Sequence, residues 1–289
     1  MVEPDTAALG TPGGLWLKLE SLQHTGSFKP RGAFNSVLSV PGPDIPPEGI
    51  TAASGGNHGL AVAHVARALG LRATIFIPEV SPAVKRERIA ALGATVRVGG
   101  ALYDDAQAEC DRFASATGAL EVHPYDTNTT IAGQATLALE LEGQIGVPDT
   151  VLVAVGGGGL AAGVAAWFGG RTRIVTVEPE SSACLHAALA AGRPVPVPVS
   201  GVAADSLGAR QVGSLAFAQL NGQVDLSLTV PDRAIAEAQR LLFSELRIVV
   251  EPGGATALAA LTGGIYRSRP GERLAVIVCG GNADPSTLA

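Results

Sequence analysis

The sequence predicts an α/β protein with parallel sheets, and three observations point to this class. Short apolar, β-branched runs alternate with longer alanine-rich segments that have helical spacing, as in βαβ units. The runs at 151–155 and 274–278 contain no polar residue, which is typical of strands buried on both faces of a sheet. Glycine-rich loops follow several of these runs, where the chain would turn from a strand into a helix.

The predicted elements follow one another along the whole chain. Strands are expected at 15–19, 50–53, 74–77, 95–98, 151–155, 174–177, 226–230, 248–250 and 274–278. The clearest helical segments are 58–69, 82–92, 131–144 and 233–245.

Two loops suggest how the 289 residues divide into domains. Residues 41–49 are rich in proline and glycine, and residues 123–130 form a polar stretch before a helix. A self-contained run of strands and helices lies between these loops. We therefore predict a small α/β domain at 49–126, inserted into a large domain made of 1–48 and 127–289.

Composition excludes several classes of protein. With 47% hydrophobic and 16% charged residues, the chain is not disordered. Its net charge of −6, without a block of like charge, argues against nucleic-acid and anionic-membrane partners. No apolar run reaches the length of a membrane span, and the start of the chain does not resemble a signal peptide. Three scattered cysteines indicate neither a disulfide framework nor a zinc site, so we expect a cytoplasmic protein.

Four consecutive glycines follow the predicted strand 151–155, namely Gly156, Gly157, Gly158 and Gly159. Such a loop, at the start of a helix, presents backbone N–H groups to a phosphate. A tight turn is the alternative, but four glycines cost much backbone entropy. A dinucleotide fingerprint also fits here, with Ala161 as its third small residue and Glu178 as its acidic residue. That fingerprint normally opens its domain, whereas this loop lies in the middle of the chain.

Two further loops lie at strand ends. Ser54, Gly55, Asn57 and His58 belong to SGGNHG, which opens a helix and suits a carboxylate; an ordinary helix cap with a buried histidine is the alternative. Cys279 begins CGGN after the strand 274–278. Ligands of parallel sheets gather at the carboxyl ends of strands, so the three loops together predict a binding site.

Lys29 is one of only three lysines, and it stands at the mouth of a predicted helix beside Phe28. The helix dipole disfavours a cation there, and desolvation adds to this, so the position suits a lysine with a lowered pKa that reacts as a neutral amine. A solvated surface lysine is the alternative.

The segment LKLESLQHTGSFK at 17–29 resembles the cofactor-lysine motif of fold-type II pyridoxal-phosphate (PLP) enzymes, in particular the serine/threonine dehydratase group. The motifs SGGNHG, GGGGL and CGGN then occur in the order and spacing of that family. The resemblance covers the chain from about residue 15. It implies a two-domain fold like that of the tryptophan synthase β subunit, with PLP as cofactor.

The resemblance also implies roles for individual residues. Lys29 would bind the cofactor covalently and later move the Cα proton. The other cofactor-binding residues would be Phe28, Asn57, Gly156, Gly157, Gly158, Gly159, Gly208 (beside Leu207) and Cys279. The substrate would be received by Ser54, Gly55, Asn57, His58 and Tyr125, with Asn128 as a further candidate for its side chain.

The activity that the resemblance implies is the dehydration and deamination of L-serine or L-threonine to a 2-oxo acid and ammonia, by a homodimer. Alternatives are a lyase for 3-hydroxyaspartate or phenylserine, a cysteine-synthase-like enzyme, a serine racemase, a non-catalytic PLP-binding protein and an NAD-dependent oxidoreductase. Gly55 stands where racemases carry a second serine as acid/base, so the dehydratase is preferred.

Some relatives bind a divalent metal after the strand at 174–177. Glu178 and the Ser182 carbonyl match two of its ligands, but Cys184 stands where an aspartate is expected. Magnesium and calcium require oxygen ligands. We therefore assign no divalent metal site, and a monovalent cation is favoured over one.

Overall fold

The computed structural model describes residues 14–81, 83–101, 103–284 and 286. The chain divides into two compact units. The larger unit consists of the residues up to Phe28 and from Gln134 onward, and the smaller one is Lys29–Gly133. The range 49–126, which we predicted as a small domain, lies inside the smaller unit; the start and end of the predicted large domain lie outside the described residues.

The larger unit is built on a five-stranded, entirely parallel sheet in the order β1-β9-β6-β7-β8. Its strands are β1 (Leu15–Leu19), β6 (Thr150–Ala154), β7 (Arg173–Pro179), β8 (Leu226–Val230) and β9 (Leu274–Val278). All residues of β6 and β9 are buried, as their continuous apolar sequences predict.

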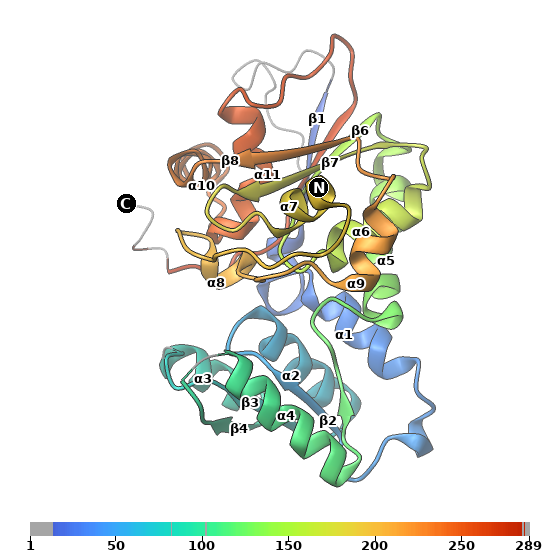
Figure 1. Ribbon diagram of the computed structural model, residues 1–289, viewed down its shortest axis with the longest axis vertical. Helices are drawn as coiled ribbons and strands as arrows, with labels where there is room; N and C mark the ends of the chain where they lie inside the picture. The colour runs from blue at the N-terminus through green and yellow to red at the C-terminus, as the bar shows by residue number, and fades with distance from the viewer. Residues whose placement is uncertain (1–13, 82, 102, 285, 287–289) are drawn as a thin grey trace. The chain divides into compact units, whose positions relative to one another are not determined.

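The connections between the strands distribute the helices over the two faces of this sheet (Figure 1). The chain moves in one direction from β6 through β7 to β8, and helices α6 (Gly159–Phe168), α7 (Cys184–Ala191), α8 (Ala204–Leu207) and α9 (Ser214–Leu220) belong to these connections. It then returns to β9 through α10 (Asp232–Leu246) and α11 (Pro252–Thr262), which cover the opposite face. The strand order therefore reverses between the neighbouring strands β6 and β9.

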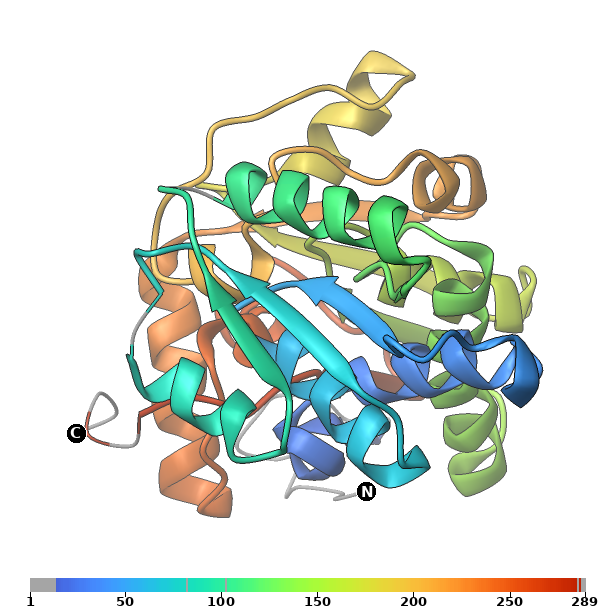
Figure 2. The same ribbon diagram turned by 90° about the horizontal axis from the view of Figure 1, so that it is seen from below.

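The smaller unit holds a second parallel sheet, in the order β4-β3-β2-β5. Its strands are β2 (Ile50–Ala53), β3 (Ala73–Ile77), β4 (Thr95–Val98) and β5 (Leu120–Glu121). Figure 2 shows α4 (Tyr103–Thr117) on one face, with α2 (Asn57–Leu69) and α3 (Ala83–Ala90) on the other. Helix α1 (Lys29–Leu38) begins this unit, and α5 (Asn128–Ile145) begins at its end.

The α/β class with parallel sheets is confirmed, and the elements differ from expectation in two places. The predicted strand 248–250 is wrong, because Ile248 N–H closes the end of α10 on Leu242 O, 3.2 Å away, and the next residues only connect α10 to α11. The short strand β5 was not predicted. Residue 82, where a helix was expected to begin, lies outside the described residues.

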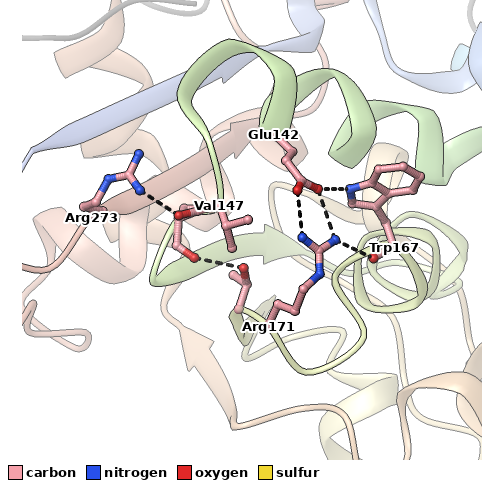
Figure 3. Close-up of polar contacts among 7 residues, drawn as sticks. Glu142, Val147, Trp167, Arg171 and Arg273 are labelled. Atoms are coloured by element: carbon pink, nitrogen blue, oxygen red, sulfur yellow. Dashed lines mark hydrogen bonds and ion pairs between the residues drawn. The ribbon is translucent and has the colours of Figure 1, made fainter.

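Polar contacts also tie together loops near the amino ends of the strands of the larger unit (Figure 3). Glu142, on α5, accepts hydrogen bonds from both terminal nitrogens of Arg171, at 2.7 and 3.1 Å. It also accepts one from Trp167 Nε1 at 2.7 Å. Arg273 donates to Val147 O at 2.8 Å, just beyond the end of α5. These contacts fix the C-terminal end of α5 at the amino ends of the strands, whereas the glycine loop lies at their carboxyl ends.

Among the described residues, no helix combines the length and the apolar character that crossing a membrane would require.

Candidate active site

The glycine loop follows β6 at the carboxyl end of the larger sheet. Strand β9 is the neighbour of β6, but its connecting helices come from the opposite face. Such a switch point leaves a crevice at the carboxyl ends of the two strands, where ligands of parallel sheets bind. The topology therefore brings Cys279 and its CGGN loop to the same edge as Gly156.

The glycine loop has the conformation of an anion cradle. Gly158 has φ +94°, which favours glycine, and a Cβ there would lie 2.9 Å from side-chain carbons of Ala216 and Val212. The N–H groups of Gly157, Gly158 and Gly159 have no acceptor in the part of the chain that the structure describes. Three such donors at the start of α6 fit a phosphate group.

Another predicted cofactor residue, Gly208, lies beside this loop. A Cβ on Gly156 would approach Leu207 Cα to 3.2 Å, so the loop passes close to the 207–208 segment. A Cβ on Gly208 would lie 2.0 Å from Ala204 O. The close approach of these backbones explains why glycine stands at both positions.

Cys279 joins the third loop to the same network. The residue is buried, its thiol donates to Gly253 O at 3.3 Å, and Gly253 N–H in turn donates to Ser206 Oγ at 3.1 Å. The Cys279 carbonyl accepts the N–H of Phe28 at 3.1 Å. The structure thus brings together the predicted cofactor residues of the larger unit, Phe28, Gly156, Gly208 and Cys279.

In the smaller unit, Lys29 is the first residue of α1, as its sequence context predicts. Its Nζ donates to the carbonyl of Pro124 at 2.8 Å. Pro124 lies in a turn that His123 stabilises, because His123 Nδ1 accepts the N–H groups of Tyr125 and Asp126 at 3.3 and 2.9 Å. Burial is the main cause that lowers the pKa of His123, and the nearby Lys29 contributes. The unprotonated Nδ1 that this turn requires is therefore favoured.

The SGGNHG motif forms the start of α2, as predicted. Ser54 Oγ accepts the N–H of Gly56 at 3.2 Å, and Asn57 is the first helical residue. The ring of His58 is engaged by the backbone: Nε2 donates to Val122 O at 2.6 Å. Burial, with a contribution from Lys29, lowers the pKa of His58 to about 3, so the ring is neutral. A carboxylate could be received here by backbone N–H groups, while the His58 ring is engaged elsewhere.

Ser81 was not among the site residues predicted from the sequence. Its Oγ lies 2.6 Å from the position that a Cβ on Gly55 would occupy, and Ile77 Cγ2 lies 3.0 Å from the same point. Ser81 follows β3, the neighbour of β2, so both residues stand at carboxyl ends of adjacent strands. The expected pairing of these two consecutive strands could have indicated that Ser81 lies near Gly55. A hydroxyl is therefore present beside Gly55, although Gly55 itself has none.

Tyr125, the predicted contact for the substrate side chain, packs its ring edge-on against the His123 ring, with centroids 5.0 Å apart. Asn128, also a candidate, is the first residue of α5.

Of the residues considered for a divalent metal, Glu178 and Cys184 have other partners in the structure. Both oxygens of Glu178, which is fully buried, accept N–H groups of α7, from Leu185 at 2.8 Å and His186 at 2.7 Å. The Cys184 thiol donates to Gly156 O at 3.2 Å. Burial raises the pKa of Glu178 to about 7. A sulfur and an engaged carboxylate do not suit magnesium or calcium. The monovalent cation remains a prediction. Ser182 Oγ, in the same segment, is buried and has no hydrogen-bond partner among the described residues.

Comparison with known proteins gives the family. A model of the family described as "pyridoxal-phosphate dependent enzyme" matches residues 2–280. The biosynthetic L-threonine dehydratase of Escherichia coli is 38% identical over 272 residues, which are 93% of this chain and 53% of that protein. The phenylserine dehydratase of Ralstonia pickettii is 36% identical over 94% of this chain and 84% of its own length. The chain spans about half the length of several of the curated relatives it matches.

Solved structures agree with this result. Maize serine racemase superimposes with a TM-score of 0.92 and 33% identity, over 99% of this chain and 89% of that one. The processed form of threonine deaminase isoform 2 from Solanum lycopersicum gives a TM-score of 0.91 and 31% identity, over 98% and 83%. Both are fold-type II enzymes, so the predicted fold is confirmed. The chain belongs to the family of pyridoxal-phosphate dependent enzymes, and its cofactor is pyridoxal phosphate.

Proposed function

We propose that this protein is a PLP-dependent ammonia-lyase that converts L-serine or L-threonine to a 2-oxo acid and ammonia. The observation that carries the proposal is the similarity, at 34–38% identity over more than nine-tenths of the chain, to proteins named threonine dehydratase or ammonia-lyase. The phosphate cradle after β6 supports it independently, since its three N–H donors suit the cofactor's phosphate.

In this proposal the residues of the larger unit hold the cofactor. Gly156, Gly157, Gly158 and Gly159 bind its phosphate, while Phe28, Gly208 and Cys279 contact its ring. From the smaller unit, Lys29 binds it covalently and Asn57 binds its hydroxyl. The bound cofactor supplies an aldehyde that condenses with amines and a ring that withdraws electrons from the bonds at Cα.

The remaining work is done by side chains and backbone of this protein. Lys29 Nζ takes the proton from the substrate Cα as general base, and the Pro124 carbonyl is an acceptor that orients this amine. The N-terminus of α2, with Ser54, Gly55, Asn57 and the backbone of His58, binds the substrate carboxylate. Tyr125 and Asn128 contact the substrate side chain.

The choice between serine, threonine and another β-hydroxy amino acid depends on that last contact. One relative is named phenylserine dehydratase, so an aromatic β-hydroxy amino acid is an alternative substrate. We propose serine and threonine as the preferred substrates. We also propose that the protein acts as a homodimer in the cytoplasm and takes a monovalent cation. The three cysteines are buried free thiols, which suits a reducing compartment.

The test is the variant Lys29→Ala, with Lys85→Ala, on α3, as the matched control. We expect Lys29→Ala to lose the visible absorbance of the covalently bound cofactor and to slow ammonia release from L-threonine and L-serine by roughly 10²- to 10⁴-fold or more, since the general base is lost. Lys85→Ala should keep both. Ammonia release that persists at the wild-type rate in Lys29→Ala would refute the mechanism.

A second candidate function is serine racemisation. The observation that favours it is Ser81, whose hydroxyl stands beside Gly55, where racemases carry their second serine. Maize serine racemase is also among the similar structures. Chiral analysis of the products from L-serine separates the two functions: D-serine that forms with the wild type and disappears in Ser81→Ala would favour the racemase.

A further inference from the structure

The three donors of the glycine loop are oriented by hydrogen bonds to the carbonyl groups of the same loop. Gly156 O accepts the Cys184 thiol at 3.2 Å. Gly157 O accepts the N–H of Gly213 at 3.0 Å, and Gly158 O accepts that of Ala162 at 2.8 Å. Three successive carbonyls are thus held by three different segments, namely α7, the start of α9 and the first turn of α6.

Each of these bonds fixes one N–H group. In a planar trans peptide, the C=O of one residue and the N–H of the next point in opposite directions. All peptide bonds of the described residues are trans. Holding the carbonyls of Gly156, Gly157 and Gly158 therefore sets the directions of the N–H groups of Gly157, Gly158 and Gly159. These are the three donors without an acceptor in the described chain.

Cys184 is the one side chain among these three anchors, since the other two are backbone groups. It is fully buried at the start of α7. The Glu178 carboxylate lies beside this thiol. Glu178 in turn binds the N–H groups of Leu185 and His186, which fixes the start of α7 and with it the position of Cys184.

We propose that Cys184 is a positioning residue for the cofactor phosphate: its thiol holds the Gly156 carbonyl and so directs the Gly157 N–H into the phosphate cradle. The inference rests on the proposed function, in which this loop binds the phosphate of PLP. A pre-oriented donor binds without the entropic cost of ordering the loop, so loss of the anchor should weaken binding of the phosphate and leave the rest of the cofactor unaffected.

The experiment measures the dissociation constants of PLP and of pyridoxal, which lacks the phosphate, for the full-length protein after removal of its cofactor. Both compounds carry the aldehyde that reacts with Lys29, so their ratio reports on the phosphate alone. The variants are Cys184→Ala, which removes the donor, and Cys184→Ser, which keeps one. Thermal unfolding of each cofactor-free variant checks the fold.

We expect Cys184→Ala to bind PLP about 2- to 10-fold more weakly, the worth of one hydrogen bond, with pyridoxal affinity unchanged. Cys184→Ser should stay closer to the wild type for both compounds. Equal PLP affinity in Cys184→Ala and the wild type, or an equal loss of affinity for PLP and pyridoxal, overturns the role of Cys184 but leaves the assignment of the glycine loop intact. A wild type that binds PLP no better than pyridoxal overturns the assignment of the glycine loop as well.

Discussion

At the scale of single residues, His58 couples folding to pH. Its pKa is about 3 in the folded protein and near 6.5 when exposed, so only the unfolded chain takes up a proton between these values. Its contribution to stability is complete above pH 6.5 and is lost as the pH falls, by about 1.4 kcal/mol per pH unit. Glu178 acts in the opposite sense between pH 4.5 and about 7, because its raised pKa keeps a proton on the folded chain.

The variant His58→Gln tests the contribution of this histidine to the pH dependence of stability. The amide of glutamine can still donate to Val122 O, but it does not titrate. We expect the difference in free energy of unfolding between variant and wild type to shift in favour of the variant as the pH falls from 6.5 to 4.5. Urea denaturation at several pH values measures it. The Glu178 contribution is common to both proteins, so parallel curves would contradict the assignment.

His58 and Ser81 also show which features of the site could not be predicted from the sequence. The motif SGGNHG correctly places the start of α2, but the direction of the His58 ring depends on Val122, 64 residues away along the chain. Ser81 has no motif of its own, and only the pairing of β2 with β3 brings it beside Gly55. Local patterns predict where a loop lies, whereas contacts between distant segments decide which side chains face it.

At the scale of secondary-structure elements, the two ends of α6 provide a matched pair of glycines. Gly158 precedes the helix with φ +94°, and a Cβ there would lie 2.9 Å from Ala216 Cβ and Val212 Cγ2. Gly169 follows the helix with φ +52°, and a Cβ there would meet no atom within 4 Å. Both substitutions strain the backbone, but only the first also overpacks its surroundings.

We therefore expect Gly158→Ala to lower the free energy of unfolding by about 2–5 kcal/mol, against about 1 kcal/mol for Gly169→Ala. Gly158→Ala should also weaken PLP binding, because its loop carries the phosphate donors. Denaturant unfolding and PLP titration measure the two effects. Equal losses of stability in both variants would mean that the close contacts around Gly158 relax at little cost.

Most elements could be predicted because the spacing of apolar residues and the positions of glycine-rich and proline-rich loops agree with the structure. Continuous apolar runs gave β6 and β9, and the glycine loop marked the start of α6. The failures are short segments, where local preference is weakest. The β-branched residues at 248–250 lie in a connection between two packed helices, and β5 has only two residues, whose pairing with β2 supplies the strand conformation.

At the scale of the whole molecule, the two units differ in how the chain builds them. The smaller unit is one continuous stretch, Lys29–Gly133. Its core residues, among them Ile50, Val62 and Ile75, all belong to that stretch. The larger unit needs two stretches, because its edge strand β1 precedes the smaller unit and pairs with β9, from near the end of the chain.

This difference predicts that the continuous unit folds alone and that the remainder does not. A fragment of residues 29–133 has the size of a small domain and contains both its sheet and its core. It should show a cooperative thermal transition by circular dichroism and dispersed amide signals by NMR. A fragment of residues 134–289 lacks β1, which leaves one edge of the apolar strand β9 unpaired, and should aggregate. A fragment 29–133 that melts without cooperativity would show that its core is insufficient without the rest of the chain.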